Sequence, residues 1–176
     1  MNARFKDRKD AGRILADKLS KYTNHPNAVV LALPRGGVPV AYEVAQELGL
    51  PLDVLIVRKL GVPNHEELAM GAIASGGIRF LNRSVIESLR ILPETLEAVE
   101  RREALELMRR EAIYRGNRSP IQVEGRIVIL IDDGIATGST MRVAIQLLRA
   151  QHVQKNHRGH SRRTAFSKMG NRTLGG

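Results

Sequence analysis

The feature of this 176-residue sequence that most constrains its fold is an aliphatic run ending in two adjacent carboxylates. Residues 127–131 read Ile-Val-Ile-Leu-Ile, which is typical of a strand buried on both faces of a parallel sheet. Asp132 and Asp133 follow, then a loop of glycines and hydroxyl side chains, then an amphipathic helix expected over residues 141–150. Such a loop offers free backbone N–H groups beside the positive end of the helix dipole. The segment therefore predicts a phosphate site next to an acidic pair.

The charge distribution favours an enzyme of anionic substrates over a nucleic-acid-binding protein. The net charge is +10, but residues 151–176 hold six basic and no acidic residues, which leaves 22 basic against 18 acidic residues, or +4, in residues 1–150. The chain has no cysteine, so it has neither a disulfide nor a thiolate site. No stretch is typical of a signal peptide or a membrane span. We expect a cytoplasmic protein without a membrane partner, and a basic nucleic-acid binder remains the alternative.

The first half of the chain predicts a βαβ unit. A helix is expected over residues 10–21, a buried strand over 28–33, a helix from Pro39 to Leu48 that stops at Gly49, and a second buried strand over 52–57. Two strands joined through a helix indicate a parallel pair with a right-handed crossover.

The middle of the chain predicts a hairpin and a long charged helix. Strands are expected over residues 69–74 and 78–81 around a Ser-Gly-Gly turn, and a helix over residues 93–115. Opposite charges four residues apart support that helix at Glu97/Arg101 and Glu106/Arg110. We expect the helix to lie on the surface, because its apolar stripe is imperfect; the stripe consists of Leu96, Val99, Leu105, Met108 and Ala112.

Polar or glycine-rich sequence follows three of the predicted strands. These segments are Arg35-Gly36-Gly37, Arg58-Lys59 and residues 132–140. Ligands of open α/β sheets collect outside the carboxyl ends of the strands, so the three segments predict one site for a ligand with phosphates at both ends and hydroxyls between them. The loop lacks the lysine of a Walker-type nucleotide site, and Gly36-Gly37 lacks the spacing of a dinucleotide-binding loop.

These segments resemble the type I phosphoribosyltransferases. Residues 128–140 are similar to that family's phosphoribosyl-pyrophosphate signature, residues 33–37 to its pyrophosphate loop, and Val57-Arg58-Lys59 to its next strand end. The resemblance extends over residues 10–150. It implies an α/β fold with a Rossmann-like open parallel sheet, in which residues 1–150 form the domain, and a hood of helices and a hairpin that recognises the base.

The resemblance implies a role for each segment. Asp132 and Asp133 would hold the ribose 2- and 3-hydroxyls and stabilise positive charge at the anomeric carbon. Pyrophosphate would be held by Arg35, Gly36 and Gly37, assisted by Arg58 and Lys59. The 5-phosphate would be held by the loop Gly134, Ile135, Ala136, Thr137, Gly138, Ser139 and Thr140.

The reaction implied is displacement of pyrophosphate from phosphoribosyl pyrophosphate by a nitrogenous base, the chemistry of a pentosyl-class glycosyltransferase in nucleotide metabolism. Mg²⁺ would be held mainly by the substrate and water, and no residue of the chain is assigned as its ligand. A homodimer is compatible with the resemblance. The alternative is a non-catalytic regulatory protein that senses phosphoribosyl pyrophosphate.

Residues 151–176 do not resemble the family. Where a doubly wound sheet needs another apolar strand, this basic tail has no periodicity, and we expect it to be disordered and part of the sheet to be missing. Codons for residues 156–164, read one base later, can encode Ile-Ile-Val-Ala-Ile-Pro-Val-Ala-Pro, a strand and a turn. We therefore hypothesise that the tail is a frameshifted reading of an ordinary C-terminal segment.

Overall fold

The computed structural model describes residues 6–133 and 139–155, which divide into two compact units. The first unit contains the described residues up to Leu55 and those from Val123 to Met141. The second contains Ile56–Gln122 and the described residues from Arg142 onward. Helix α5 (Ser139–Lys155) therefore begins in the first unit and continues in the second.

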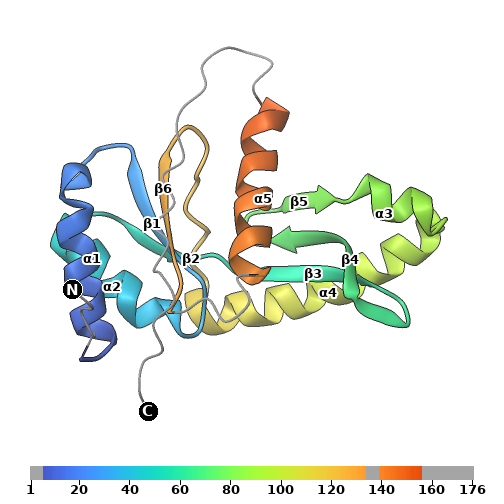
Figure 1. Ribbon diagram of the computed structural model, residues 1–176, viewed down its shortest axis with the longest axis horizontal. Coiled ribbons are helices and arrows are strands. Elements are labelled where there is room, and N and C mark those ends of the chain that lie inside the picture. The colour runs from blue at the N-terminus through green and yellow to red at the C-terminus, as the bar shows by residue number, and fades with distance from the viewer. Residues whose placement is uncertain (1–5, 134–138, 156–176) are drawn as a thin grey trace, which may run out of the picture. The chain divides into compact units, whose positions relative to one another are not determined.

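The first unit is built on a three-stranded parallel sheet. Its strands are β1 (Ala28–Ala32), β2 (Leu52–Val54) and β6 (Ile127–Ile131), in the order β2-β1-β6 (Figure 1). The sheet confirms the predicted α/β fold and parallel pairing. Residues 128–130 of β6 have no exposed surface, as expected for a strand covered on both faces. Among the described residues β6 pairs only with β1, so it is an edge of the described sheet.

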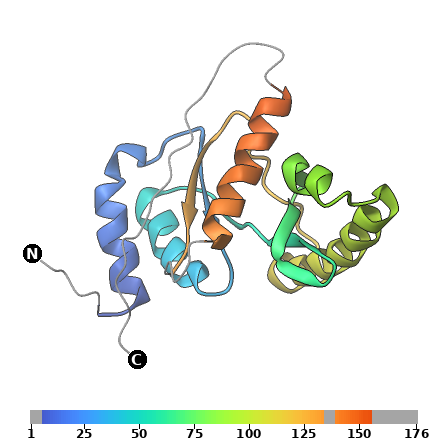
Figure 2. The ribbon, with the colours of Figure 1, turned by 45° about the vertical axis from the view of Figure 1, so that its right-hand side comes forward.

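Two helices of the first unit, α1 (Arg8–Lys18) and α2 (Gly37–Leu48), lie side by side (Figures 1 and 2). The side chain of Asp7 caps α1 by accepting a hydrogen bond from the Asp10 N–H. A Cβ at Gly12 would lie 2.8 Å from the carbonyl oxygen of Val40, so the close approach of the two helices requires glycine there. This contact holds α1 against α2 and so sets the position of the N-terminal end of α1.

Several element boundaries differ from the sequence-based expectation. Helix α1 starts and ends earlier than residues 10–21 and is followed by a short 3-10 helix, η1 (Ser20–Tyr22). Helix α2 begins two residues before Pro39, and it ends as predicted at Gly49, whose φ of 62° suits glycine. The predicted strand over residues 52–57 is wrong in extent, because β2 stops at Val54.

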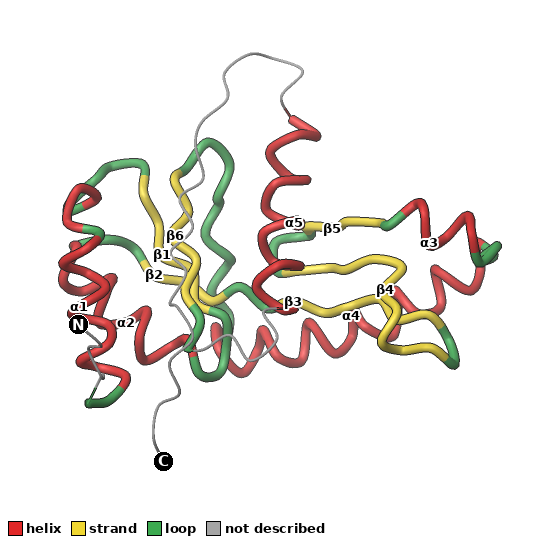
Figure 3. The backbone as a smooth tube through the Cα atoms, in the orientation of Figure 1, coloured by secondary structure: helices red, strands yellow, loops and turns green. Residues whose placement is uncertain are grey.

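The second unit contains an antiparallel sheet. Its strands are β3 (Val57–Val62), β4 (His65–Ala74) and β5 (Ile78–Leu81), in the order β3-β4-β5 (Figure 3). The β4–β5 pair confirms the predicted hairpin, and Gly76 and Gly77 both have positive φ in its turn. Helix α3 (Arg83–Ser88) follows β5, and α4 (Pro93–Arg115) contacts β3 and β4 with the predicted bounds.

The face that α4 buries differs from the predicted stripe. Val99 is buried as expected, together with Leu107. Leu105 and Met108, however, are 70% and 63% exposed. The prediction failed here because Glu103 occupies a buried position on the packed face, where an apolar residue would be expected.

Helix α5 is longer than the predicted residues 141–150. It begins at Ser139 and extends to Lys155, five residues into the segment expected to be a disordered tail. Residues 156–176, to which the rest of that expectation applies, lie outside the described residues.

Candidate active site

The segments after β1 and β6 lie next to each other at the carboxyl edge of the parallel sheet. The two strands are paired up to Ala32 and Ile131, their last residues. The pairing continues past Ala32, because the Leu33 N–H donates to the Ile131 carbonyl oxygen over 2.8 Å. The predicted pyrophosphate loop therefore starts beside the predicted acidic pair.

Two glycines allow this close approach. A Cβ at Gly36 would collide with the carboxylate of Asp133. A Cβ at Gly37 would lie 2.7 Å from the Ile131 carbonyl oxygen and 3.0 Å from the Cα of Asp132. Both glycines are thus required by the acidic pair opposite them, and Gly37 also opens α2.

The loop presents one arginine to solvent. Arg35 is exposed, and its guanidinium makes no hydrogen bond or ion pair with the residues that the structure describes. The Gly37 N–H, predicted to bind pyrophosphate, donates to the Leu33 carbonyl oxygen over 3.0 Å. In this conformation Arg35 is therefore a more accessible donor than the Gly37 amide.

The two carboxylates have different surroundings. Burial, helped by the neighbouring charge of Asp133, raises the pKa of Asp132 above its ordinary value. The Asp133 N–H opposes that shift by donating to the Asp132 carboxylate over 2.9 Å. The carboxylate of Asp133 instead accepts a hydrogen bond from Arg8 of α1, with 3.0 Å between Nη2 and Oδ2.

Arg8 is a site residue that the sequence-based prediction missed. It is 125 positions away from Asp133 in the chain, so no local motif connects them. The predicted helix also began at residue 10, after Arg8. The only signal in the sequence was the capping residue Asp7, which places the helix start at Arg8.

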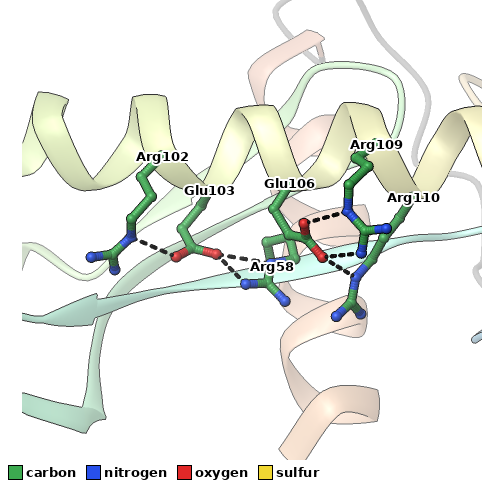
Figure 4. A network of polar contacts seen from close by, with 6 residues as sticks. All are labelled: Arg58, Arg102, Glu103, Glu106, Arg109 and Arg110. Carbon is green, nitrogen blue, oxygen red and sulfur yellow. Dashed lines mark hydrogen bonds and ion pairs between the residues drawn. The ribbon is translucent and has the colours of Figure 1, made fainter.

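Arg58 and Lys59 do not follow a strand of the parallel sheet. They lie inside β3 of the second unit, because β2 ends earlier than predicted. Arg58 donates from Nε and Nη2 to one carboxylate oxygen of Glu103 on α4, over 2.8 and 2.5 Å (Figure 4). Lys59 is exposed. The pyrophosphate role of both residues stays a prediction.

Most of the predicted 5-phosphate loop, Gly134, Ile135, Ala136, Thr137 and Gly138, lies outside the described residues. The last two loop residues, Ser139 and Thr140, form the start of α5, with Thr140 exposed. The first turn of α5 contains no acidic residue that would repel an anion.

The model of the phosphoribosyl transferase domain matches residues 4–158. The chain belongs to this family. It is 50% identical over 151 residues to a protein of Mycobacterium tuberculosis named "Putative phosphoribosyl transferase", a match that covers 86% of this chain and 34% of that protein. It is 33% identical over 99 residues to the "Bifunctional protein PyrR" of Brevibacillus brevis, covering 53% of this chain and 54% of that protein.

The phosphoribosyl transferase fold of this chain also has a solved counterpart. The crystal structure of TT1426 from Thermus thermophilus matches with a TM-score of 0.70 and 40% identity, covering 84% of this chain and 70% of that one. This chain spans about a third of the length of the mycobacterial relatives. No helix in the described part of this chain is both long and apolar enough to cross a membrane.

Proposed function

We propose that this chain transfers the phosphoribosyl group of 5-phosphoribosyl 1-pyrophosphate to a nitrogenous base and releases pyrophosphate, as a pentosyl-class glycosyltransferase. Membership of the transferase family supports the class of activity. One observation carries the specific proposal: Asp132 and Asp133, at the end of β6, lie directly against the glycines of the loop after β1. This arrangement suits a ligand that has hydroxyls next to a pyrophosphate.

The acidic pair would act on the ribose. Its carboxylates can accept hydrogen bonds from the 2- and 3-hydroxyls and so hold the sugar in place. As the bond between C1 and the pyrophosphate oxygen breaks, positive charge develops on the ring, and nearby carboxylates stabilise it. The base nitrogen then forms its bond to C1 and gives up its proton to the departing pyrophosphate or to water, while pyrophosphate leaves with the electron pair of the broken bond. No residue of the chain needs to become a covalent nucleophile.

The phosphates would be held on either side of the ribose. Arg35 is exposed and available for pyrophosphate, which a guanidinium can bind through two hydrogen bonds. The 5-phosphate would bind at residues 134–140, next to the N-terminus of α5. Arg58 and Lys59, which lie on β3 of the second unit, stay predicted assisting cations.

The residues present fit a magnesium ion that is shared with the substrate. The described residues contain no group of three or more potential metal ligands, but Asp132 and Asp133 offer hard oxygen donors where the ribose would bind. When bound, Mg²⁺ neutralises charge on the departing pyrophosphate.

We also propose a cytoplasmic location, a place in nucleotide metabolism and a homodimer for this chain.

The experiment that tests this function replaces both carboxylates. In a chain carrying Asp132→Asn and Asp133→Asn, pyrophosphate release should fall by at least about 100-fold, because the groups that stabilise the transition state are gone. Asp17→Asn is the matched control, since Asp17 is an exposed carboxylate on α1 in the same unit, and it should retain wild-type activity. Turnover by the double variant near the wild-type rate would refute the assigned roles.

The acceptor requires a screen of purine, pyrimidine and other nitrogen bases with phosphoribosyl pyrophosphate and Mg²⁺. Isothermal titration of phosphoribosyl pyrophosphate should accompany the screen. Binding together with pyrophosphate release for one base supports the transferase. If phosphoribosyl pyrophosphate binds but none of the bases leads to release of pyrophosphate, the transferase proposal is overturned in favour of a regulatory sensor.

A further inference from the structure

Arg8 brings a cation from the N-terminal helix to the candidate site. It is the first residue of α1, and its Nη2 lies 3.0 Å from Oδ2 of Asp133. The Arg8 side chain is 49% exposed and that of Asp133 is 31% exposed. The pair is therefore open enough for a ligand to reach it.

The position of Arg8 is set by the fold. The N-cap of Asp7 fixes where α1 begins, and the contact at Gly12 holds α1 against α2. Helix α2 in turn starts from the loop whose Gly36 touches the Asp133 carboxylate. Three separate segments of the chain thus bring Arg8, Gly36 and Asp133 to one place.

Most of the hydrogen-bonding capacity of Arg8 is left over. A guanidinium has five N–H donors in a planar fork, and among the described residues only one of them is used, on Asp133. Without a ligand, Arg8 balances the charge of Asp133 beside a second carboxylate. Ribose hydroxyls that donated to this same oxygen of Asp133 would compete with Arg8, and the released guanidinium would be available to an anion next to it.

We propose, on the basis of the proposed function, that Arg8 is a pyrophosphate-binding residue. It stays hydrogen-bonded to Asp133 until the substrate binds. The pyrophosphate loop at Gly36 adjoins the same carboxylate, so the leaving group would lie within reach of Arg8. Arginine suits this role because its fork matches two phosphate oxygens at once. Moving the cation from Asp133 to pyrophosphate would also remove positive charge from the carboxylate that faces the developing cation.

The test compares Arg8→Gln and Arg8→Lys with wild type in titrations of phosphoribosyl pyrophosphate, inorganic pyrophosphate and ribose 5-phosphate, each with Mg²⁺. Arg8→Gln should weaken binding of the two pyrophosphate-containing ligands by about tenfold, the effect of losing a charge-assisted hydrogen bond. Ribose 5-phosphate should bind as well as before or more tightly. Arg8→Lys should fall between wild type and Arg8→Gln, because lysine keeps the charge but not the fork.

Arg13→Gln is the matched control. Arg13 lies on the same helix and pairs with Glu43 of α2 over 3.5 Å, so its loss should leave all three affinities unchanged. Unchanged pyrophosphate affinity in Arg8→Gln would overturn the proposal, as would a parallel loss of ribose 5-phosphate affinity, which would indicate that Arg8 only anchors Asp133. Failure of the wild-type chain to bind phosphoribosyl pyrophosphate would instead refute the proposed function, and the pyrophosphate titrations would still test Arg8.

Discussion

The arginines of the two units have different neighbours. In the first unit, Arg35 is exposed without a partner among the described residues, and Arg8 makes one open contact with Asp133. In the second unit, Arg58 places two donors on Glu103, and Arg115 is buried against Glu111 and Ser75. An arginine that is paired with a carboxylate must give up that contact before it binds an external anion, whereas Arg35 needs no such exchange. In the second unit, Arg58 connects β3 to α4, and Arg115 connects α4 to Ser75, the residue after β4.

The carboxylates differ in the same way. In the first unit, Asp132 and Asp133 lie side by side at a strand end, and one arginine approaches them. In the second unit, Glu103 and Glu106 each contact two arginines (Figure 4). An acidic pair with only one arginine nearby has carboxylate oxygens left to accept hydrogen bonds from ligand hydroxyls. Carboxylates that each contact two arginines have less of this accepting capacity left. The comparison therefore predicts larger functional effects in the first unit and larger stability effects in the second.

The largest effect is expected from Gly36→Ala. The new Cβ would meet the flexible end of Asp133, so the carboxylate would move while the backbone stayed in place. Displacing a group that binds the substrate by about 1 Å costs about 100-fold in rate, which should appear as reduced pyrophosphate release at nearly unchanged stability.

Gly37→Ala is the matched control for that prediction. Its Cβ would meet the backbone carbonyl of Ile131, which cannot move freely, so this variant should lose about 1–3 kcal/mol of unfolding free energy. Urea denaturation and a turnover assay on both variants separate the two effects. A Gly36→Ala chain with normal turnover would show that the position of Asp133 does not matter.

The same contrast explains which parts of the molecule the sequence could predict. The buried strand β6 and the acidic pair were predicted because an apolar run and the polar residues directly after it form a local pattern. The hairpin β4–β5 and the bounds of α4 were predicted for the same reason. The closeness of the glycine loop and the acidic pair also followed from a rule, since parallel strands end at one edge.

Contacts between distant segments could not be read in this way. The pairing of Arg8 with Asp133 depends on how α1 packs on α2, which no spacing in the sequence encodes. The burial of Glu103 depends on Arg58 reaching it from β3, so a helical pattern alone assigned the wrong face of α4. The position of Arg58 was misjudged because residues 55 and 56 continue the apolar pattern past the end of β2.

The second prediction concerns Glu103→Gln. Glu103 is 7% exposed and accepts hydrogen bonds from both Arg58 and Arg102. Removing its charge leaves these donors with a weaker hydrogen-bond acceptor at a site largely shielded from water. The loss should cost about 2 kcal/mol of unfolding free energy in urea denaturation.

Glu106→Gln provides the exposed counterpart and should have a much smaller effect. Hydrogen bonds from Arg109 and then Arg110 lower the pKa of Glu106 to about 2, but water screens these charges. Its small contribution should be present above the ordinary pKa of 4.5 and disappear as the pH falls towards 2. If Glu106→Gln destabilised the protein more than Glu103→Gln, burial would not be the deciding factor.

The smallest effect on stability is expected from Asp132→Asn, and it should be stabilising. Because the pKa of Asp132 is raised in the folded chain, ionisation of this carboxyl group opposes folding. The penalty is absent below the ordinary pKa of 3.8 and grows as the pH rises through the raised value, so asparagine should increase the melting temperature at pH 7 and lose this advantage near pH 3.

Asp133→Asn should act in the opposite direction at pH 7, since it gives up the ion pair with Arg8. Melting curves of both variants across this pH range check the signs, and equal shifts for the two would mean that the surroundings of the carboxylates do not differ as the structure indicates. A stabilised Asp132→Asn chain without turnover would show that the acidic pair is maintained for its chemistry at a cost to the fold.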